Sequence, residues 1–325
     1  MTRELLILRH GKSDWGTGLD DFSRPITDRG KRSAQRIGVW LAEQGLQPDT
    51  VVSSPAERAI TTTQKALKAM GGDALGIERD RRIYAAGLAS LLAVLADAPV
   101  AAGRVLIVGH NPGLEELLEH LVGTVGGLIE GGKLLPTATL AWLEMPDDWS
   151  RNQLQRGCAR LLSLTRPRSL PKKFPFPGPG SDERRDRPAY YYQQSSVIPY
   201  RIGKKGPEVL VIASSQNKHA VVPKGIKEPG LSPRESAAKE AWEEAGVEGK
   251  IDETALGVYR YQKWGAECTV EVYPMLVTRE VPEDEWEESH RGREWLSAAK
   301  AAKRVKQREL ASLIDVLLKR LKGNR

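Results

Sequence analysis

The sequence has only two cysteines, Cys158 and Cys268, in 325 residues. Without CxxC spacing, two thiols build neither a disulfide framework nor a cysteine zinc site, so we expect two buried thiols. No apolar run approaches the roughly 18 to 20 residues that cross a bilayer. Residues 1–11 also lack the long apolar region of a secretory signal. These absences exclude membrane-spanning and disulfide-rich secreted classes and predict a cytoplasmic protein without a membrane partner.

Aromatic residues are few, at 6% of the chain, whereas charged residues make up 28%. The net charge of +7 is unevenly distributed: 19 basic and 19 acidic residues cancel in 1–165, 7 minus 3 gives +4 in 166–187, and 23 minus 20 gives +3 in 188–325. A positive surplus suits an anionic partner, but a surplus of this size is also common on ordinary protein surfaces.

A segment rich in proline, glycine and charge divides the chain. Residues 166–187 read RPRSLPKKFPFPGPGSDERRDR, which offers no repeating apolar face, so we expect an exposed linker. A length of 325 residues, at roughly 100 to 200 per domain, favours two domains. The sequence therefore predicts domains at 1–165 and 188–325.

The two halves show different secondary-structure patterns. In the first half, apolar runs at 5–8, 50–52 and 105–108 alternate with helical spacing such as that of 33–44, which predicts an α/β domain with a mainly parallel sheet. In the second half, the expected elements indicate an α+β domain. They are strands at 195–200, 208–213, 256–261 and 269–277, and helices at 236–245 and 307–321.

Polar clusters follow the three predicted strands of the first half. They are Arg9-His10-Gly11, residues 53–58 (SSPAER) and residues 109–112 (GHNP). Ligands of open parallel sheets bind at the carboxyl ends of the strands, so these clusters should form one pocket. Guanidinium groups match phosphate geometry, and an imidazole among them can act as a nucleophile. The pattern predicts phosphoryl transfer to histidine.

These clusters resemble the histidine phosphatase superfamily, and within it the SixA-type phosphohistidine phosphatases. The segments LRHGKSDW, DFSRPITDRG, VVSSPAERA and VLIVGHNPGLEEL stand in the family's order within the first 160 residues. The resemblance implies a phosphoglycerate-mutase-like fold, His10 as the phosphorylated nucleophile, and a phosphate pocket of Arg9, Arg58 and His110. It implies no cofactor in this half and a phosphohistidine protein as a partner.

The first half departs from larger family members at two places. Gly16 stands where they have Asn, and residues 82–85 (RIYA) occupy the region of their glutamate acid. A phosphoramidate leaving group needs less acid assistance than an alkoxide, so phosphohistidine is favoured over sugar phosphates. Asp14, Asp20 and Tyr84 are candidates for proton transfer.

In the second half, the predicted helix at 236–245 carries Glu240, Glu243 and Glu244 on one face. Ala238, Ala241, Trp242 and Ala245 fall on the other side, which should pack. Three carboxylates at this spacing repel one another unless a cation lies between them. Oxygen ligands select hard ions, so we expect Mg²⁺ or Mn²⁺.

This stretch resembles the Nudix box of hydrolases that cleave diphosphate linkages. Gly225 opens the box and Gly246-Val247 closes it. The resemblance implies that Glu240, Glu243 and Glu244 bind metal together with the Lys224 carbonyl, and that Glu243 is the best candidate for general base. Leu231 and Lys239 stand where the family has Glu and Arg.

The wider second half is similar to the diphosphoinositol and dinucleoside polyphosphate branch, through residues 209–215 and 278–295. The implied substrate is a nucleotide, such as a dinucleoside polyphosphate or nucleoside triphosphate, or an inositol polyphosphate. Basic residues could line the approach of such an anion. They are Arg201, Lys204, Lys205, Lys218, Lys224, Lys227 and Lys263.

The sequence thus predicts a bifunctional phosphohydrolase with two chemistries. One alternative is that one half is an inactive sensor of a phosphorylated ligand that regulates the other half. Another is an RNA 5′ end pyrophosphohydrolase, for which residues 190–192 (YYY) are the only aromatic cluster that could stack bases. Since these tyrosines adjoin a predicted strand, nucleic acid is not the expected partner.

Overall fold

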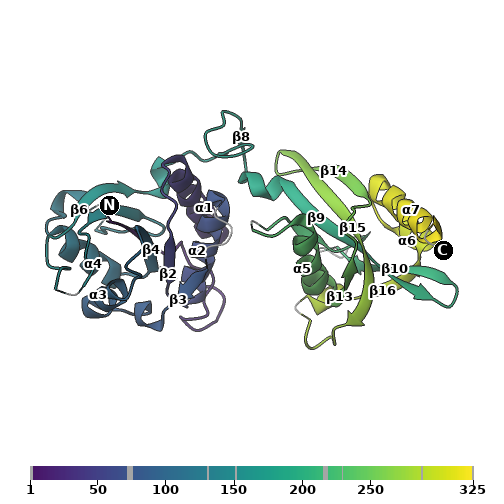
Figure 1. Cartoon of the computed structure of the whole chain (residues 1–325), viewed down its shortest axis with the longest axis horizontal. Helices are drawn as coiled ribbons and strands as arrows, with labels where there is room; N and C mark the ends of the chain where they lie inside the picture. The colour runs from purple at the N-terminus through teal and green to yellow at the C-terminus, as the bar shows by residue number, and fades with distance from the viewer. Residues whose placement is uncertain are drawn as a thin grey trace. The chain divides into compact units, whose positions relative to one another are not determined.

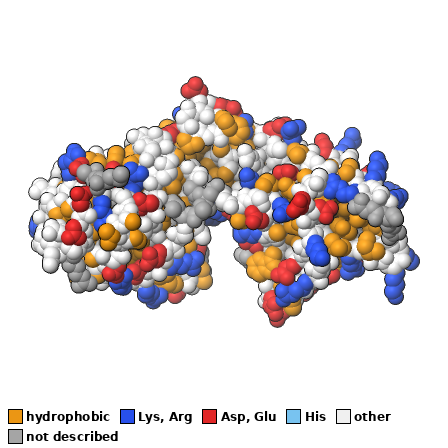
Figure 2. Space-filling view, viewed as in Figure 1, with side chains coloured by type: hydrophobic (Ala, Val, Ile, Leu, Met, Phe, Trp, Pro, Cys, Tyr) orange, Lys and Arg blue, Asp and Glu red, His pale blue; other side chains and the backbone are white. Residues whose placement is uncertain are grey.

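The computed structural model describes residues 3–71, 76–129, 132–150, 152–214, 219–228, 230–286 and 288–323. Its contacts divide the chain into two units, Met1–Arg184 and Arg185–Arg325 (Figure 1), and each is described by itself. Basic and acidic side chains are interspersed on the visible faces in Figure 2. None of the described helices has the length and apolar character needed to cross a bilayer.

Unit 1 contains a six-stranded sheet in the order β3-β2-β4-β1-β5-β6. The first four of these strands are parallel, whereas β5 runs antiparallel to β1 and to β6. The expected α/β domain with a mainly parallel sheet is therefore confirmed. The elements are β1 (Arg3–Arg9), α1 (Asp28–Glu43), β2 (Thr50–Ser53), α2 (Glu57–Met70), β3 (Ile77–Arg79), α3 (Leu88–Ala96), β4 (Arg104–Gly109), α4 (Gly113–Val122), β5 (Leu140–Met145) and β6 (Arg160–Thr165).

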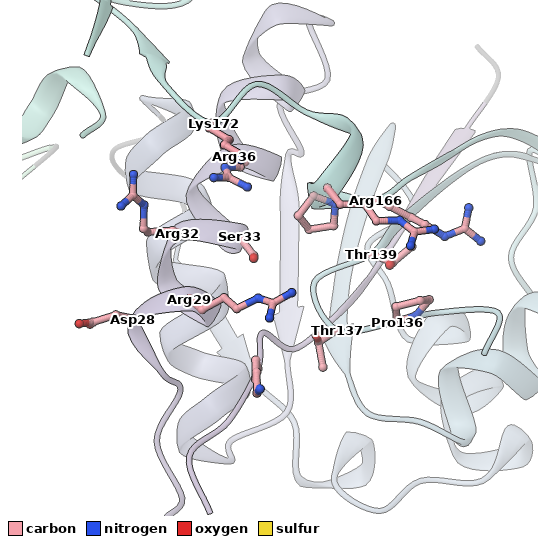
Figure 3. A pocket seen from close by; sticks show the side chains of 13 residues that line it. Asp28, Arg29, Arg32, Ser33, Arg36, Pro136, Thr137, Thr139, Arg166 and Lys172 are labelled. Carbon is pink, nitrogen blue, oxygen red and sulfur yellow. The ribbon is translucent and has the colours of Figure 1, made fainter. Parts of the chain in front are cut away.

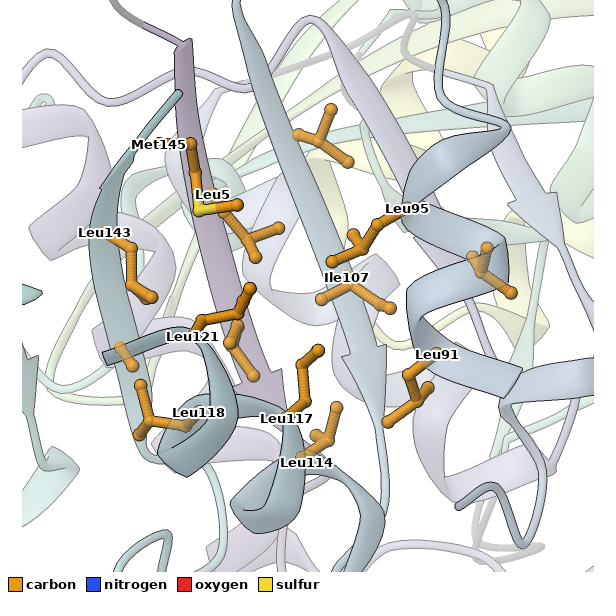
Figure 4. Close-up of a cluster of buried hydrophobic side chains, with 14 of the residues drawn as sticks. Leu5, Leu91, Leu95, Ile107, Leu114, Leu117, Leu118, Leu121, Leu143 and Met145 are labelled. Atoms are coloured by element: carbon orange, nitrogen blue, oxygen red, sulfur yellow. The ribbon is translucent and has the colours of Figure 1, made fainter. Parts of the chain in front are cut away.

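The core of unit 1 lies on both faces of this sheet, because successive side chains of β1 point to opposite sides. Leu5 and Ile7 pack in a cluster with α3 and α4, which Figure 4 shows, while Leu6 and Leu8 pack with α1 and α2. A strand buried on both faces reads as a continuous apolar run, as residues 5–8 do. This sandwich fixes the carboxyl ends of the strands at one edge.

The contact boundary at Arg184 falls inside the segment that the sequence predicts to be an exposed linker. Phe174 is buried, and the short strands β7 (Phe174–Pro175) and β8 (Arg184–Arg185) pair with each other. The turn Pro167–Ser169 contacts α1, and Arg166 Nη2 donates to the Leu128 carbonyl at 2.6 Å. The early part of the segment therefore packs on unit 1, and the boundaries at 165 and 188 stay a prediction.

Unit 2 is an α+β fold around an eight-stranded sheet, as expected. Strands β11-β10-β9-β15-β13 form its main path, β12 pairs with β9, β14 with β15, and β16 with β10. Helix α5 packs on one hydrophobic cluster, and α6 and α7 pack on another. The elements are β9 (Gln193–Gly203), β10 (Gly206–Ala213), β11 (Ala220–Val221), β12 (Lys224–Ile226), α5 (Pro233–Ala245), β13 (Val247–Ile251), β14 (Gly257–Lys263), β15 (Ala266–Glu280), β16 (Glu294–Ser297), α6 (Ala298–Arg304) and α7 (Arg308–Gly323).

Two expectations about burial need correction. Both cysteines are free, but only Cys268 is buried, and Cys158 is half-buried. On α5, Ala241 and Ala245 are buried as predicted, whereas Trp242 remains 40% exposed. A helix of this length buries only its narrow central stripe, and Trp242 lies beside that stripe.

Close packing of α1 on α2 gives the first testable prediction. A Cβ at Gly38 would lie 2.0 Å from the carbonyl oxygen of Ala66, so the two helices approach through this glycine. We expect Gly38→Ala to lower the free energy of unfolding of unit 1 by about 3 kcal/mol, because an overpacked core must shift backbone. The control is Gly126→Ala, where nothing lies within 4 Å of the new methyl group. In urea denaturation of the full chain, Gly38→Ala should unfold at a lower urea concentration than Gly126→Ala. Equal midpoints for the two variants would contradict the close packing of α1 on α2.

Candidate functional site

The polar clusters that follow β1, β2 and β4 lie around one cavity of about 810 Å³ in unit 1. Helices α2 and α4 begin just after β2 and β4, so their N-terminal ends lie at the same sheet edge, where helix dipoles favour an anion. The four residues predicted for this pocket all line it. They are Arg9, His10, Arg58 and His110.

The ring of His10 is held in one orientation. Its Nδ1 lies 2.7 Å from the Gly11 carbonyl oxygen, which can only accept, so Nδ1 carries the hydrogen and Nε2 keeps its lone pair. Burial lowers the pKa of His10 to about 4, and the charges of Arg58, Arg9 and Arg24 also act to lower it. His10 is therefore a neutral imidazole with a free lone pair at neutral pH, as a nucleophile requires.

His110 lies beside His10, with ring centroids 5.0 Å apart. Its Nε2 is 2.8 Å from Ser54 Oγ, which fixes the ring, while its buried Nδ1 has no hydrogen-bond partner among the described residues. Burial lowers the pKa of His110 to about 3, with His10 and Arg58 contributing. A buried nitrogen without a partner indicates a position for a ligand atom.

A carboxylate that sequence reasoning missed holds the arginines of the pocket. Asp21 Oδ1 lies 2.6 Å from Arg24 Nη2, and Asp21 Oδ2 lies 2.8 Å from Arg58 Nη2 and 2.9 Å from the Tyr84 hydroxyl. The hydrogen bond from Arg24 holds the pKa of Asp21 well below its usual range, although burial opposes this. Asp21 belongs to the DFSRPITDRG segment, but only the fold shows that it contacts Arg58 and Tyr84, which are distant in the sequence.

The structure separates the three candidates for proton transfer. Tyr84 lines the cavity, and burial followed by the Asp21 hydrogen bond raises the pKa of its hydroxyl. Asp14 and Asp20 do not line the cavity, and they accept from the backbone amides of Gly16 and Ser23 at the surface. Among the candidates, only Tyr84 is therefore placed to meet a ligand.

Unit 2 has its own polar cavity, of about 540 Å³, beside α5. This helix begins at a capping box in which Ser232 and Glu235 exchange hydrogen bonds, and it ends at Gly246 in the left-handed conformation. Glu240, Glu244 and Lys224 line the cavity, whereas Glu243 does not. Three of the four predicted metal-site residues are therefore brought together.

Glu240 is packed against backbone in this cavity. A Cβ at position 225 would lie 1.8 Å from Glu240 Oε1, so a larger residue there would displace the carboxylate from this position. Burial, together with the carboxylates of Glu244 and Glu243, raises the pKa of Glu240 to about 8. Among the described residues, no hydrogen bond or ion pair partners this carboxylate.

Glu244 is held by cations and by the backbone. Its Oε2 accepts from the Lys224 amide at 3.0 Å, and its Oε1 contacts Arg291 Nη1. Arg291 is fixed in turn by Glu288 at 2.9 Å and by the Ala213 carbonyl at 2.9 Å. Burial raises the pKa of Glu244, although these donors oppose the shift.

Glu243 is engaged on the helix surface, where Lys239 Nζ lies 2.9 Å from its Oε1. Lys239 also lies 3.6 Å from Glu228 Oε1, so the lysine that replaces the family's arginine still bridges two carboxylates. Within the described ranges, no three Asp, Glu, His or Cys side chains already form a metal-binding group. The buried pair of Glu240 and Glu244 nevertheless offers the oxygen donors that Mg²⁺ or Mn²⁺ prefers.

Only some of the basic residues predicted to attract an anionic substrate lie at this cavity. Lys224 and Lys263 line it, and Lys263 Nζ lies 4.3 Å from the ring centroid of Trp264, a lining residue that sequence reasoning missed. Arg201 pairs instead with Glu208 and Glu280. Three further lysines, Lys204, Lys205 and Lys227, do not line the cavity. Lys218 lies outside the described residues.

Two family models match this chain, one in each unit. Residues 5–84 match the histidine phosphatase superfamily (branch 1), and residues 192–316 match the NUDIX domain. The chain joins a histidine phosphatase superfamily domain to a NUDIX domain. Both belong to hydrolase families, and the mixed α/β sheets of the two units fit these assignments.

Curated relatives match the histidine phosphatase domain. The 2,3-bisphosphoglycerate-dependent phosphoglycerate mutases of Xylella fastidiosa (strain M12) and Nocardia farcinica (strain IFM 10152) are each 40% identical over 88 residues. These matches cover 26% of this chain and 34% and 35% of those proteins. The chain thus spans about a third of the length of the curated relatives it matches.

Solved structures resemble each domain. A phosphohistidine phosphatase SixA from Agrobacterium tumefaciens is 29% identical, with a TM-score of 0.43, and the match covers 51% of this chain and 98% of that one. An Ap4A hydrolase from C. elegans is 23% identical, with a TM-score of 0.36, and the match covers 41% of this chain and 98% of that one.

The charge state of His10 can be measured directly. Because a buried imidazole among guanidinium groups resists protonation, the ring of His10 should stay neutral as pH falls and titrate near pH 4. Proton NMR of the histidine ring signals in the full chain, assigned by their loss in His10→Asn, tests this. His290, which is exposed, serves as the reference ring. Titration of His10 near its ordinary value of 6.5 would overturn the electrostatic account.

Proposed function

We propose that the chain is a bifunctional phosphohydrolase, and that its histidine phosphatase domain cleaves a phosphoramidate such as phosphohistidine. The observation that carries the proposal is the geometry of His10: its Nδ1 lies 2.7 Å from the Gly11 carbonyl oxygen, which leaves the lone pair on Nε2, and the Arg58 guanidinium, held by Asp21, lies in the same cavity. The preference over a sugar phosphate comes from the sequence, because no carboxylic acid stands at residues 82–85 to protonate an alkoxide. Glu116 also lines the cavity, so Glu116→Gln is the variant that tests whether a carboxyl group assists the leaving group.

The proposed reaction has two steps. His10 Nε2 attacks phosphorus, the phosphorus–nitrogen bond of the substrate breaks, and the leaving nitrogen takes a proton from water or from the Tyr84 hydroxyl. Water then attacks phospho-His10, the phosphorus–nitrogen bond to His10 breaks, and inorganic phosphate leaves. A proton from the attacking water restores the Tyr84 hydroxyl if it was the donor, and His10 is again a neutral imidazole. Arg9 and Arg58 neutralise the phosphoryl oxygens in both steps, and His110 donates to one of them.

We propose that the NUDIX domain hydrolyses a diphosphate linkage with Mg²⁺ or Mn²⁺, which would polarise the phosphates and activate water. Glu240 and Glu244 would hold the ion together with the Lys224 carbonyl. Glu243 is the proposed general base, a role that follows from its place in the motif, and it would have to leave its ion pair with Lys239 to face the cavity. Arg291 orients Glu244, and Lys224 and Lys263 attract the phosphates.

Within the substrate classes predicted from sequence, the cavity favours a nucleoside polyphosphate over an inositol polyphosphate. Trp264 and Tyr261 line it, and Lys263 Nζ and Lys224 Nζ lie 4.3 Å and 5.3 Å from their ring centroids. A base would stack on these rings by displacing the lysine side chains toward the phosphates. A dinucleoside polyphosphate or nucleoside triphosphate is therefore the proposed substrate of this domain.

Removal of the nucleophile tests the first activity. In His10→Ala, release of phosphate from a phosphohistidine peptide in EDTA should fall by about 10³-fold or more, because no other group replaces the lone pair. Mg²⁺-dependent hydrolysis of a dinucleoside polyphosphate should be unchanged. His120→Ala, which alters a histidine outside the cavity, is the matched control. Full phosphatase activity in His10→Ala would rule out the assignment.

Two isosteric substitutions test the second activity. Glu240→Gln should abolish Mg²⁺-dependent hydrolysis yet leave the metal-free chain as stable as before or more so, since it removes a buried carboxylate beside Glu244. Glu243→Gln should lower turnover by about 10²-fold or more and retain stabilisation by Mg²⁺. Calorimetry measures the stability of each variant with and without Mg²⁺, and nucleotide analysis measures its turnover. Glu248→Gln on β13 is the control. Normal turnover in Glu240→Gln would refute the metal assignment.

A further inference from the structure

Unit 1 contains a second cavity, of about 770 Å³, that no sequence motif indicated. It lies between α1, the loop at residues 136–139 and the segment at residues 166–172, and Figure 3 shows it from close by. We call it the α1 cavity. Its lining residues include four on α1 whose spacing places them along one helix face, and these are Arg29, Arg32, Ser33 and Arg36.

The lining of the α1 cavity is strongly basic. Seven lysine or arginine side chains line it, against one acidic side chain, Asp28. Asp28 points away from the cavity in Figure 3 and lies 3.6 Å from Lys31, whereas Arg29 extends across it toward Thr137. Among the described residues, no carboxylate forms an ion pair with Arg29 or Arg36.

One of these guanidinium groups, that of the half-buried Arg36, is in an electrostatically unfavourable position. Burial lowers the pKa of Arg36, and the neighbouring charge of Arg32 lowers it further. Like charges at this spacing on a helix destabilise it. A ligand with several negative charges would relieve this repulsion, so the arrangement favours anion binding.

The α1 cavity adjoins the cavity of His10. Lys12 and Thr137 line both cavities. Helix α1 begins directly against the nucleophile loop, because a Cβ at Gly11 would lie 2.9 Å from the Gly30 carbonyl oxygen and one at Gly30 would lie 2.5 Å from that of Lys12. A ligand whose end lies at His10 can therefore continue past Lys12 toward Arg29.

We propose that the α1 cavity binds a polyphosphate anion whose end reaches the phosphoryl pocket at His10, where it competes with the phosphoramidate substrate. The part that concerns His10 rests on the proposed function, whereas anion binding in the cavity rests on its own lining. Guanidinium groups bind phosphates bidentately, which suits a polyphosphate chain.

Two other kinds of ligand fit the α1 cavity less well. A protein helix, about 10 Å across with its side chains, needs a groove lined by apolar side chains, whereas eight of the thirteen residues that line this cavity are charged. Single-stranded nucleic acid needs aromatic faces for its bases, and none of the lining residues is aromatic.

The test measures binding of inorganic tripolyphosphate to the full chain in EDTA by titration calorimetry. Arg29→Gln should weaken binding about tenfold or more, because it removes one charged, bidentate contact to phosphate. Arg36→Gln should act in the same direction. The control is Arg160→Gln, an exposed arginine on β6 with the same loss of charge. Circular dichroism and melting curves exclude unfolding as the cause.

A second measurement distinguishes failure of this inference from failure of the proposed function. Tripolyphosphate should inhibit phosphoramidate turnover by the full chain in EDTA, with an inhibition constant about tenfold higher in Arg29→Gln than in Arg160→Gln, while uninhibited turnover stays unchanged. If both variants bind tripolyphosphate equally, the α1 cavity is not a phosphate site, whatever His10 does. If phosphoramidate turnover survives His10→Ala, the proposed function fails, and the calorimetric difference still decides the anion site.

Discussion

The histidine phosphatase domain depends on keeping one imidazole neutral beside several guanidinium groups. Burial and the charges of Arg58 and Arg9 both disfavour a second proton on His10, and the Gly11 carbonyl fixes the first on Nδ1. Asp21 makes this arrangement stable, because it balances Arg24 and Arg58 from the solvent side without contacting the ring. The cations remain available to phosphate while the lone pair of Nε2 remains available to phosphorus.

The NUDIX domain has the opposite electrostatic problem. Glu240 and Glu244 are buried together, and each pKa unit by which a carboxyl group is raised corresponds to about 1.4 kcal/mol of unfavourable interaction in the charged state. The capping box of α5, its left-handed Gly246 and the close contact with Gly225 hold the helix in place against that repulsion. Two buried carboxylates whose pKa values are raised in this way are typical of a site that binds a cation.

Much of this could be predicted from sequence, because it depends on local patterns. The apolar runs at 5–8 and 105–108 predict two of the parallel strands, and the polar residues that follow them predict the pocket around His10. Asp21, Trp264 and the α1 cavity were missed because each acts through contacts between distant segments. The segment at 166–187 is predicted to be an exposed linker, yet Phe174 within it is buried, since one aromatic side chain can anchor a segment whose composition is otherwise that of a linker.

The most direct test of the central claim is to trap the phosphorylated protein. After brief incubation with a phosphoramidate in EDTA and an alkaline quench, which preserves phosphohistidine, peptide mass spectrometry locates the phosphoryl group. The account predicts phosphorylation at His10, and none in His10→Asn. A phosphoryl group on His110, or turnover with no phosphorylated peptide at any time, would contradict the assignment of His10 as the neutral nucleophile.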